Sequence, residues 1–142
     1  YSTDFKGVLK FAAEPTAPQL AALAAIFHQD IRKLEPGTEH DVYYIDLRLA
    51  KDFSGIEWDD ECEKTYGMVE MLNWITAKMR ETWPAFALTG EMVAQGEDPE
   101  DRWRVVMRDG VATRVEWPRI GQRVTCPNCR AEFTIEEPEA AS

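Results

Sequence analysis

Three consecutive segments between residues 86 and 117 place apolar side chains at every second position. Those positions are Phe86, Leu88, Met92 and Ala94 in the first segment, Trp103, Val105 and Met107 in the second, and Val111, Thr113, Val115 and Trp117 in the third. A loop rich in Gly, Asp and Pro joins the first two segments, and Asp109-Gly110 joins the second to the third. A period of two across such turns is typical of an antiparallel meander with one buried face.

The N-terminal half alternates between strand and helix patterns. A first strand is expected over residues 5–11. Apolar residues spaced three and four positions apart then predict a helix over about 19–34. Thr16 and Gln19 form a capping-box pattern at the start of this helix. Residues 43–49 alternate again, and Gly55–Trp58 reads as a short returning strand. The spacing of Met68, Leu72, Ile75 and Met79 predicts a second helix over roughly Lys64 to Trp83.

The order of these elements predicts an α+β fold. Its first six elements match the ferredoxin-like βαββαβ arrangement, an antiparallel sheet with two helices on one face, and the meander extends it by a C-terminal β-hairpin. We therefore expect an α+β body over residues 1–117, a small Cys-x-x-Cys knuckle over 118–135, and an acidic flexible tail over 136–142.

Composition narrows the class of protein. The chain has 142 residues, of which 44% are hydrophobic, with five Trp, four Tyr and six Phe, which is enough to bury the core of one domain. No apolar run is long enough to span a bilayer, and the chain does not open with a signal-peptide pattern. Three cysteines, two of them close together, suit a reducing compartment, so a cytoplasmic protein without membrane partners is expected.

Charge is distributed unevenly around the net value of −10. Residues 1–101 contain nine Lys and Arg against 20 Asp and Glu, whereas residues 102–131 contain seven Arg against only Asp109 and Glu116. The chain is therefore an acidic body with a local arginine-rich strip. An acidic surface favours basic partners and repels nucleic acid and membranes, although it also serves solubility alone.

Two acidic clusters are candidate binding residues. They are Asp59, Asp60, Glu61 and Glu63, at the expected start of the second helix, and Glu97, Asp98, Glu100 and Asp101, in the loop between two strands. Carboxylates at a helix start complement the exposed amide dipoles, and a loop keeps them solvated. The functional alternative is a surface that imitates the phosphates of nucleic acid and binds a basic groove on a partner.

The arginine strip offers an alternative nucleic-acid-binding surface. Alternation puts Arg102, Arg104, Arg108 and Arg114 on the non-core face of the meander, where Glu91 and Glu116 are potential cross-strand partners. An arginine-lined sheet face can also stack on bases or bind phosphates. Because the body is so acidic, direct nucleic-acid binding is the less favoured reading.

Cys126 and Cys129 are the candidate metal ligands. The sequence Cys126-Pro127-Asn128-Cys129 between short strand patterns resembles half of a zinc ribbon, but structural zinc takes four ligands. One alternative is that Cys62 and either His28 or His40 supply the other two zinc ligands. Another is that Cys126 and Cys129 of a second chain supply them, which makes a homodimer. In the third alternative no metal binds and the thiols are free.

A resemblance adds an expectation about origin. Residues 88–98, Leu-Thr-Gly-Glu-Met-Val-Ala-Gln-Gly-Glu-Asp, look like a Gly-Glu-apolar-x-x-Gln-Gly-Glu-Asp pattern of small, uncharacterised acidic proteins of phages and other mobile elements. The segments 54–59 and 63–66 look similar, so the resemblance spans roughly residues 5–117. It implies a phage or mobile-element origin without implying an activity, and it does not include the Cys-x-x-Cys tail.

These observations favour a non-enzymatic protein-binding module. The concrete hypothesis is an inhibitor of host defence, of anti-CRISPR type, that blocks a basic nucleic-acid-binding surface of a host protein or nucleoprotein complex. One alternative is a small nucleic-acid-binding domain that uses the arginine face and the zinc knuckle. The other is a metal-dependent phosphodiesterase with Asp46, Glu57 and Glu91 as carboxylate ligands. Neither His28 nor His40 has a nucleophile at a readable spacing.

Overall fold

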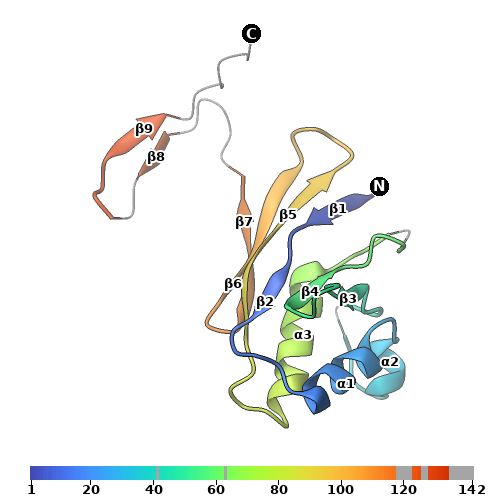
Figure 1. The fold of residues 1–142 in the computed structure, drawn as a ribbon. Helices are drawn as coiled ribbons and strands as arrows, with labels where there is room; N and C mark the ends of the chain where they lie inside the picture. The colour runs from blue at the N-terminus through green and yellow to red at the C-terminus, as the bar shows by residue number, and fades with distance from the viewer. Residues whose placement is uncertain (41, 63, 118–122, 126–127, 135–142) are drawn as a thin grey trace.

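A computed structural model describes residues 1–40, 42–62, 64–117, 123–125 and 128–134. The described chain is α+β, as the sequence predicts (Figure 1). Its helices are α1 (Ala17–Ile26), α2 (Ile31–Leu34) and α3 (Met68–Arg80). Its strands are β1 (Thr3–Lys6), β2 (Leu9–Phe11), β3 (Leu47–Leu49), β4 (Gly55–Trp58), β5 (Leu88–Gly96), β6 (Arg102–Arg108), β7 (Val111–Glu116), β8 (Arg123–Thr125) and β9 (Glu132–Thr134).

Seven of the strands form one sheet organised around β5. The hydrogen-bonded order is β3-β4-β2-β5-β6-β7, with β1 also paired to β5, and every pair is antiparallel. Strand β1 pairs with the second half of β5 and β2 with its first half, because Gly7 at φ 118° separates them. The single strand expected over residues 5–11 is therefore two. Strands β8 and β9 form a separate two-stranded sheet.

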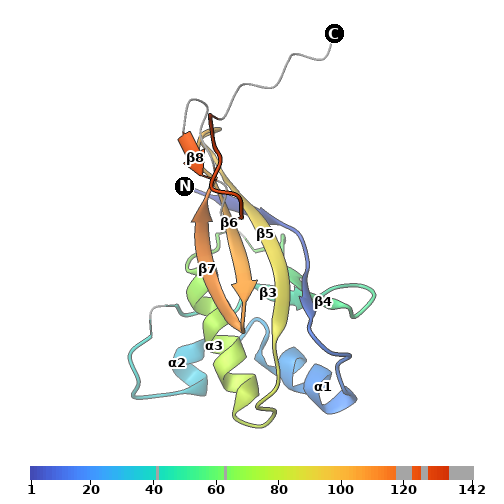
Figure 2. The same ribbon diagram turned by 90° about the vertical axis from the view of Figure 1, so that its left-hand side faces the viewer.

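The core lies between this sheet and helix α3. Figures 1 and 2 show α3 along one face of the sheet, with α1 and α2 at its lower end. The buried stripe of α3 is Met68, Met71, Leu72, Ile75 and Met79. It packs in one cluster with sheet residues that include Leu88, Met92, Val105 and Met107. Within the described residues, none of the three helices is long and apolar enough to cross a membrane.

Helix α3 also protects the edge of the sheet. The side-chain amide of Asn73 donates to the carbonyl of Ala112 at 3.1 Å, and the Ala112 N–H donates to Asn73 Oδ1 at 2.8 Å. Ala112 is the second residue of edge strand β7, and in a two-residue hairpin its backbone groups point away from β6. Asn73 therefore occupies the place that a further strand would take.

The helix expected over about 19–34 is interrupted. The capping box of Thr16 and Gln19 forms as predicted, but α1 ends at Ile26 and α2 begins only at Ile31. Between them His28 adopts φ 65°, and its N–H donates to the Ile45 carbonyl at 2.8 Å. Asp30 then forms an isolated bridge with Tyr44. Backbone pairing with the extended segment 42–46 thus replaces the helix, and only residues 47–49 of the predicted strand enter the sheet.

The second helix begins later than expected. Helix α3 starts at Met68 after Gly67, which adopts φ 70°, and it ends at Arg80. The described members of the first acidic cluster, Asp59, Asp60 and Glu61, follow β4 in a turn closed by the Cys62 N–H donating to the Asp59 carbonyl at 3.1 Å. The prediction that these carboxylates complement a helix dipole is therefore wrong.

The face of strand β7 is the opposite of the predicted one. Ala112 is 2% exposed and lies opposite Met107, whereas Val111 is 50% exposed and lies opposite Arg108. The cause is the turn: Asp109 and Gly110 both have positive φ, as in a two-residue hairpin, which makes Arg108 and Val111 direct neighbours on one face.

Candidate functional site

The second acidic cluster forms a braced loop, which we call the acidic loop (residues 97–101), between β5 and β6. At its base the Gly96 N–H donates to the Asp101 carbonyl at 2.8 Å. The Gln95 side-chain amide lies within hydrogen-bond distance of the carbonyl oxygens of Gly96, Asp98, Pro99 and Asp101, at 3.1–3.5 Å. This one amide therefore holds the inner side of the loop, and Asp98 Oδ1 adds a contact within the loop by accepting from the Glu100 N–H at 3.0 Å.

The N-terminal residues brace the same loop from outside. The Tyr1 hydroxyl donates to the Asp101 carboxylate and accepts from the Asp98 N–H at 3.2 Å. The Ser2 N–H donates to Glu97 Oε1 at 3.0 Å. The hydrogen bond to Asp101 raises the pKa of the Tyr1 phenol. A Cβ atom on Gly96 would lie 2.2 Å from Asp101 Oδ2 and 2.3 Å from the Tyr1 hydroxyl oxygen, so this contact requires glycine.

Negative charge in the acidic loop has no cationic partner in the part of the chain that the structure describes. Glu97, Asp98 and Glu100 are exposed, and Asp101 is half-buried. Among the described residues, none of the four takes part in an ion pair with Lys, Arg or His. The loop therefore presents three exposed carboxylates to solvent on a hydrogen-bonded frame.

The first acidic cluster is different, because basic side chains of the same chain contact it. Asp59 is 7% exposed, and its carboxylate lies 3.1 Å from His28 Nε2 and 3.6 Å from Arg48 Nη1. Asp60 lies 3.0 Å from Arg48 Nη1, and Glu57 lies 3.1 Å from Arg48 Nε. These carboxylates, Glu57 first, raise the pKa of Arg48.

The remaining two members of that cluster are less constrained. Glu61 is exposed, while Glu63 lies outside the described residues. Arg48 therefore offsets part of the negative charge that the structure describes here, although the side chain of Asp60 is 64% exposed. The two clusters, equivalent by composition, are not equivalent as binding surfaces.

A mixed cluster of ligating groups lies beside Asp59. One ligating atom each from His28, Asp59 and Cys62 lies within 4.8 Å of the other two. Burial first, and then the charge of Asp46, raise the pKa of the Cys62 thiol to about 12. The structure thus brings Cys62 together with His28, one of the two pairings expected from sequence. The other histidine, His40, lies next to Glu35, with Nε2 3.7 Å from Oε2.

The Cys-x-x-Cys knuckle is only partly described. Cys129 is exposed between β8 and β9, and Cys126 lies outside the described residues. The predicted metal pair of Cys126 and Cys129, and the homodimer built on it, therefore stay predictions.

The arginine strip is divided between the two sides of the sheet. Arg102, Arg104 and Arg108 alternate with the buried residues of β6 and lie on the face away from α3, as expected. Arg114 lies opposite Val105, which puts it on the core side at the end of β7. The expectation that all four share one face is wrong, for the same reason that β7 is reversed.

Three of these arginines have partners in the chain. Arg104 Nη1 lies 3.2 Å from Glu91 Oε2, and the guanidinium of Arg102 lies 4.0 Å from the centre of the Trp117 ring. Arg114 Nε lies 2.6 Å from Glu116 Oε1, and its guanidinium lies 4.2 Å from the Trp103 ring centre. These contacts match the cross-strand pairing expected of Glu91 and leave less of the arginines for phosphates.

The carboxylates of the phosphodiesterase alternative are engaged separately. The Thr65 hydroxyl donates to Asp46 at 3.0 Å, Glu57 pairs with Arg48, and Glu91 pairs with Arg104. In the part of the chain that the structure describes, they are not among the residues grouped as a possible metal site. The geometry therefore gives no support to two-metal or one-metal hydrolysis by this trio.

The chain was compared with protein-family models, curated proteins and solved structures. No match was found in any of the three comparisons.

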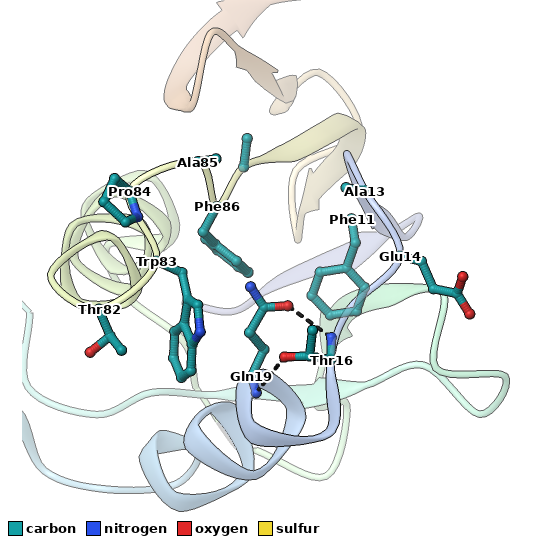
Figure 3. Close-up of a pocket in the computed structure, with 11 residues that line it drawn as sticks. Phe11, Ala13, Glu14, Thr16, Gln19, Thr82, Trp83, Pro84, Ala85 and Phe86 are labelled. Atoms are coloured by element: carbon teal, nitrogen blue, oxygen red, sulfur yellow. Dashed lines mark hydrogen bonds between the residues drawn. The ribbon is translucent and has the colours of Figure 1, made fainter.

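Sequence reasoning missed an apolar pocket beside the start of α1. It has a volume of about 330 Å³ and is lined mainly by Phe11, Trp83, Pro84 and Phe86 with Thr16 and Gln19 (Figure 3). The Thr16 N–H donates to Gln19 Oε1 at 2.9 Å and the Gln19 N–H to Thr16 Oγ1 at 3.3 Å. Because these groups serve the helix cap, the pocket has few polar groups to orient a ligand. The sequence signal for this pocket is the pair of apolar residues Trp83 and Phe86 on either side of Pro84.

Proposed function

We propose that this protein is a non-enzymatic binding module that docks onto a basic surface of a partner macromolecule through the acidic loop. The observation that carries the proposal is the loop itself, which has exposed carboxylates on a frame held by Gln95 and Tyr1. In the described residues these carboxylates have no lysine or arginine partner. The net charge of −10 acts in the same direction over longer distances.

A braced loop is the form of acidic surface that favours association. Ordering a mobile loop on binding costs conformational entropy, and a loop already fixed by hydrogen bonds avoids most of that cost. Unneutralised carboxylates also steer a basic partner during encounter and exclude acidic competitors. Both effects depend on the fixed position of the charges and not only on their number.

The partner class follows from charge. Carboxylates at fixed spacing resemble the phosphates of nucleic acid, so a basic nucleic-acid-binding surface of a host protein or nucleoprotein complex is the proposed target. The resemblance of residues 88–98 to proteins of phages and mobile elements implies an origin only, and for a protein of that origin we propose that the blocked target belongs to host defence, which makes the module an inhibitor of anti-CRISPR type in the host cytoplasm. Direct nucleic-acid binding through Arg102, Arg104 and Arg108 is the competing outcome.

We also propose a ferredoxin-like arrangement for the part of the fold that carries the loop. The antiparallel order β3-β4-β2-β5, with α1 and α2 between β2 and β3 and α3 between β4 and β5, supports it. An experimental structure with another strand order would contradict this reading.

The test uses an oligo-arginine peptide as the basic probe. The triple variant Glu97→Gln, Asp98→Asn, Glu100→Gln removes the exposed charge of the loop. The matched control, Glu14→Gln, Glu39→Gln, Glu70→Gln, removes three exposed carboxylates elsewhere and has the same net charge. Exposed charges contribute about 0.2–1 kcal/mol each, and three of them about 0.6–3 kcal/mol, so we expect the loop variant to bind the peptide roughly 3- to 150-fold more weakly than the control.

Salt and nucleic acid complete the test. The difference between the two variants should shrink steeply as ionic strength rises. Equal affinity of loop variant and control would refute the proposal, because general acidity would then explain binding. Retarded migration of DNA or RNA probes by the wild-type protein, lost on replacing Arg104, would favour the nucleic-acid-binding alternative instead.

A further inference from the structure

Three ligating side chains of different chemistry meet between the α1–α2 break and the turn after β4. His28 comes from the break between α1 and α2, and Asp59 and Cys62 come from the turn after β4. Their ligating atoms lie within 4.8 Å of one another. An imidazole, a carboxylate and a thiol together are the donor set that zinc takes in proteins.

The spacing is close to that of a tetrahedral site. Bond lengths of 2.0–2.3 Å to zinc place neighbouring ligand atoms about 3.3–3.8 Å apart. The distance of 3.1 Å between His28 Nε2 and Asp59 Oδ2 is near the lower end of this range. The three ligand atoms lie within 4.8 Å of one another, so a small side-chain rotation would bring all of them to the spacing of a zinc site. At this distance His28 and Asp59 contact each other directly.

Surrounding groups already orient the carboxylate. Asp59 Oδ1 accepts from the Glu61 N–H at 3.0 Å and lies 3.6 Å from Arg48 Nη1, which leaves Oδ2 facing His28. Such outer contacts fix the direction of a metal ligand. Behind Cys62, Trp58 Nε1 donates to Thr65 Oγ1 at 2.8 Å, and Thr65 donates to Asp46 at 3.0 Å. These two hydrogen bonds hold a second carboxylate, that of Asp46, beside the Cys62 thiol.

Charge around the thiol also favours a cation. The carboxylates of Asp46, Asp59 and Glu61 all lie close enough to Cys62 to act on it electrostatically. A divalent cation compensates this negative charge. The side chain of His28 is 52% exposed, so an ion has direct access from solvent.

We infer that His28, Asp59 and Cys62 bind a single Zn²⁺ ion, with a water molecule from solvent at the fourth position. On binding, the Cys62 S–H bond is lost, the Zn–S bond forms, and the proton passes to the buffer. The ion joins the α1–α2 break to the turn after β4, so it stabilises the fold. This site is independent of the acidic loop and of the Cys126–Cys129 knuckle.

The test is a Co²⁺ titration of the full chain after removal of metal with a chelator. A thiolate ligand gives Co²⁺ an intense charge-transfer absorption, and Zn²⁺ displaces it with a measurable stoichiometry. Three variants are compared: Cys62→Ser, His28→Gly and the double variant Cys126→Ser, Cys129→Ser. Glycine is chosen because residue 28 adopts φ 65°, so His28→Gly removes the ligand without straining the backbone.

We expect one equivalent of metal in the wild-type protein and in the double knuckle variant. Cys62→Ser should abolish the charge-transfer band, and His28→Gly should weaken affinity by at least about 100-fold while circular dichroism shows a folded chain. Absorption lost in the knuckle variant and retained in Cys62→Ser would overturn the inference. Absence of stoichiometric binding to the folded wild-type protein would overturn it as well.

Discussion

Removing the Asn73 side chain tests whether helix α3 holds the edge of the sheet. The change Asn73→Ala deletes both hydrogen bonds to the backbone of Ala112, which have lengths of 3.1 and 2.8 Å. Ala112 is 2% exposed, so its N–H and C=O cannot simply turn to water. Two lost bonds at about 1 kcal/mol each, with a further penalty for buried unpaired groups, give about 2–4 kcal/mol.

Helix propensity offsets part of this loss. Alanine is a better helix former than asparagine by about 0.5 kcal/mol, which leaves a net destabilisation of roughly 2–3 kcal/mol. The assay is urea denaturation of wild type and variant. Glu70→Ala, an exposed change on the same helix, is the control and should stay within about 0.5 kcal/mol of wild type.

A second substitution at the same residue separates hydrogen bonding from packing. In Asn73→Asp the carboxylate still accepts from the Ala112 N–H but faces the Ala112 carbonyl, which raises its pKa in the folded state. Its protonated form donates and accepts as the amide does, so stability is greatest at low pH and is lost as pH rises through the raised pKa. If Asn73→Ala unfolds within about 0.5 kcal/mol of wild type, the edge-protection argument is refuted.

Two further predictions concern local geometry. Gly96→Ala should loosen the acidic loop, because the new Cβ would lie 2.2 Å from Asp101 Oδ2. We expect weaker binding of the oligo-arginine peptide and faster hydrogen exchange of the Asp98 amide. Unchanged values for both would contradict the bracing role. The hydrogen bond from Arg32 lowers the pKa of Asp30 from its ordinary value of 3.8. The ionised Asp30 therefore stabilises the folded state above pH 3.8, and this stabilisation is lost as the pH falls through the lowered pKa. Asp30→Asn should therefore unfold more easily than wild type near neutral pH and show a smaller further loss between about pH 4 and pH 2, as denaturation at several pH values can measure.

Local patterns predicted the parts of the fold that local interactions determine. The strands β5, β6 and β7 and the Thr16 capping box follow from alternation, turn residues and cap chemistry within a few residues. The face of β7 was predictable too. A two-residue turn at Asp109-Gly110 makes Arg108 and Val111 neighbours, and the polar character of Arg108 then places Val111 outside.

Other features depend on contacts between distant segments. The break at His28 arises because its N–H pairs with Ile45, which a helical period cannot reveal. Arg48 neutralises Asp59 and Asp60 from a neighbouring strand, so counting charges made the two acidic clusters look alike. The proximity of His28 and Cys62 likewise could not be predicted from sequence spacing, because 34 positions and two strands separate the two residues.

The central claim is that the acidic loop is the docking surface. The most direct measurement is a titration of isotope-labelled protein with the oligo-arginine peptide, followed by NMR of the backbone amides. We predict that the largest shifts occur at Ser2, Gly96 and residues 97–102, with little change around Asp59 and Asp60. Shifts concentrated around Asp60 and Glu61, with the signals of residues 97–101 unmoved, would contradict it.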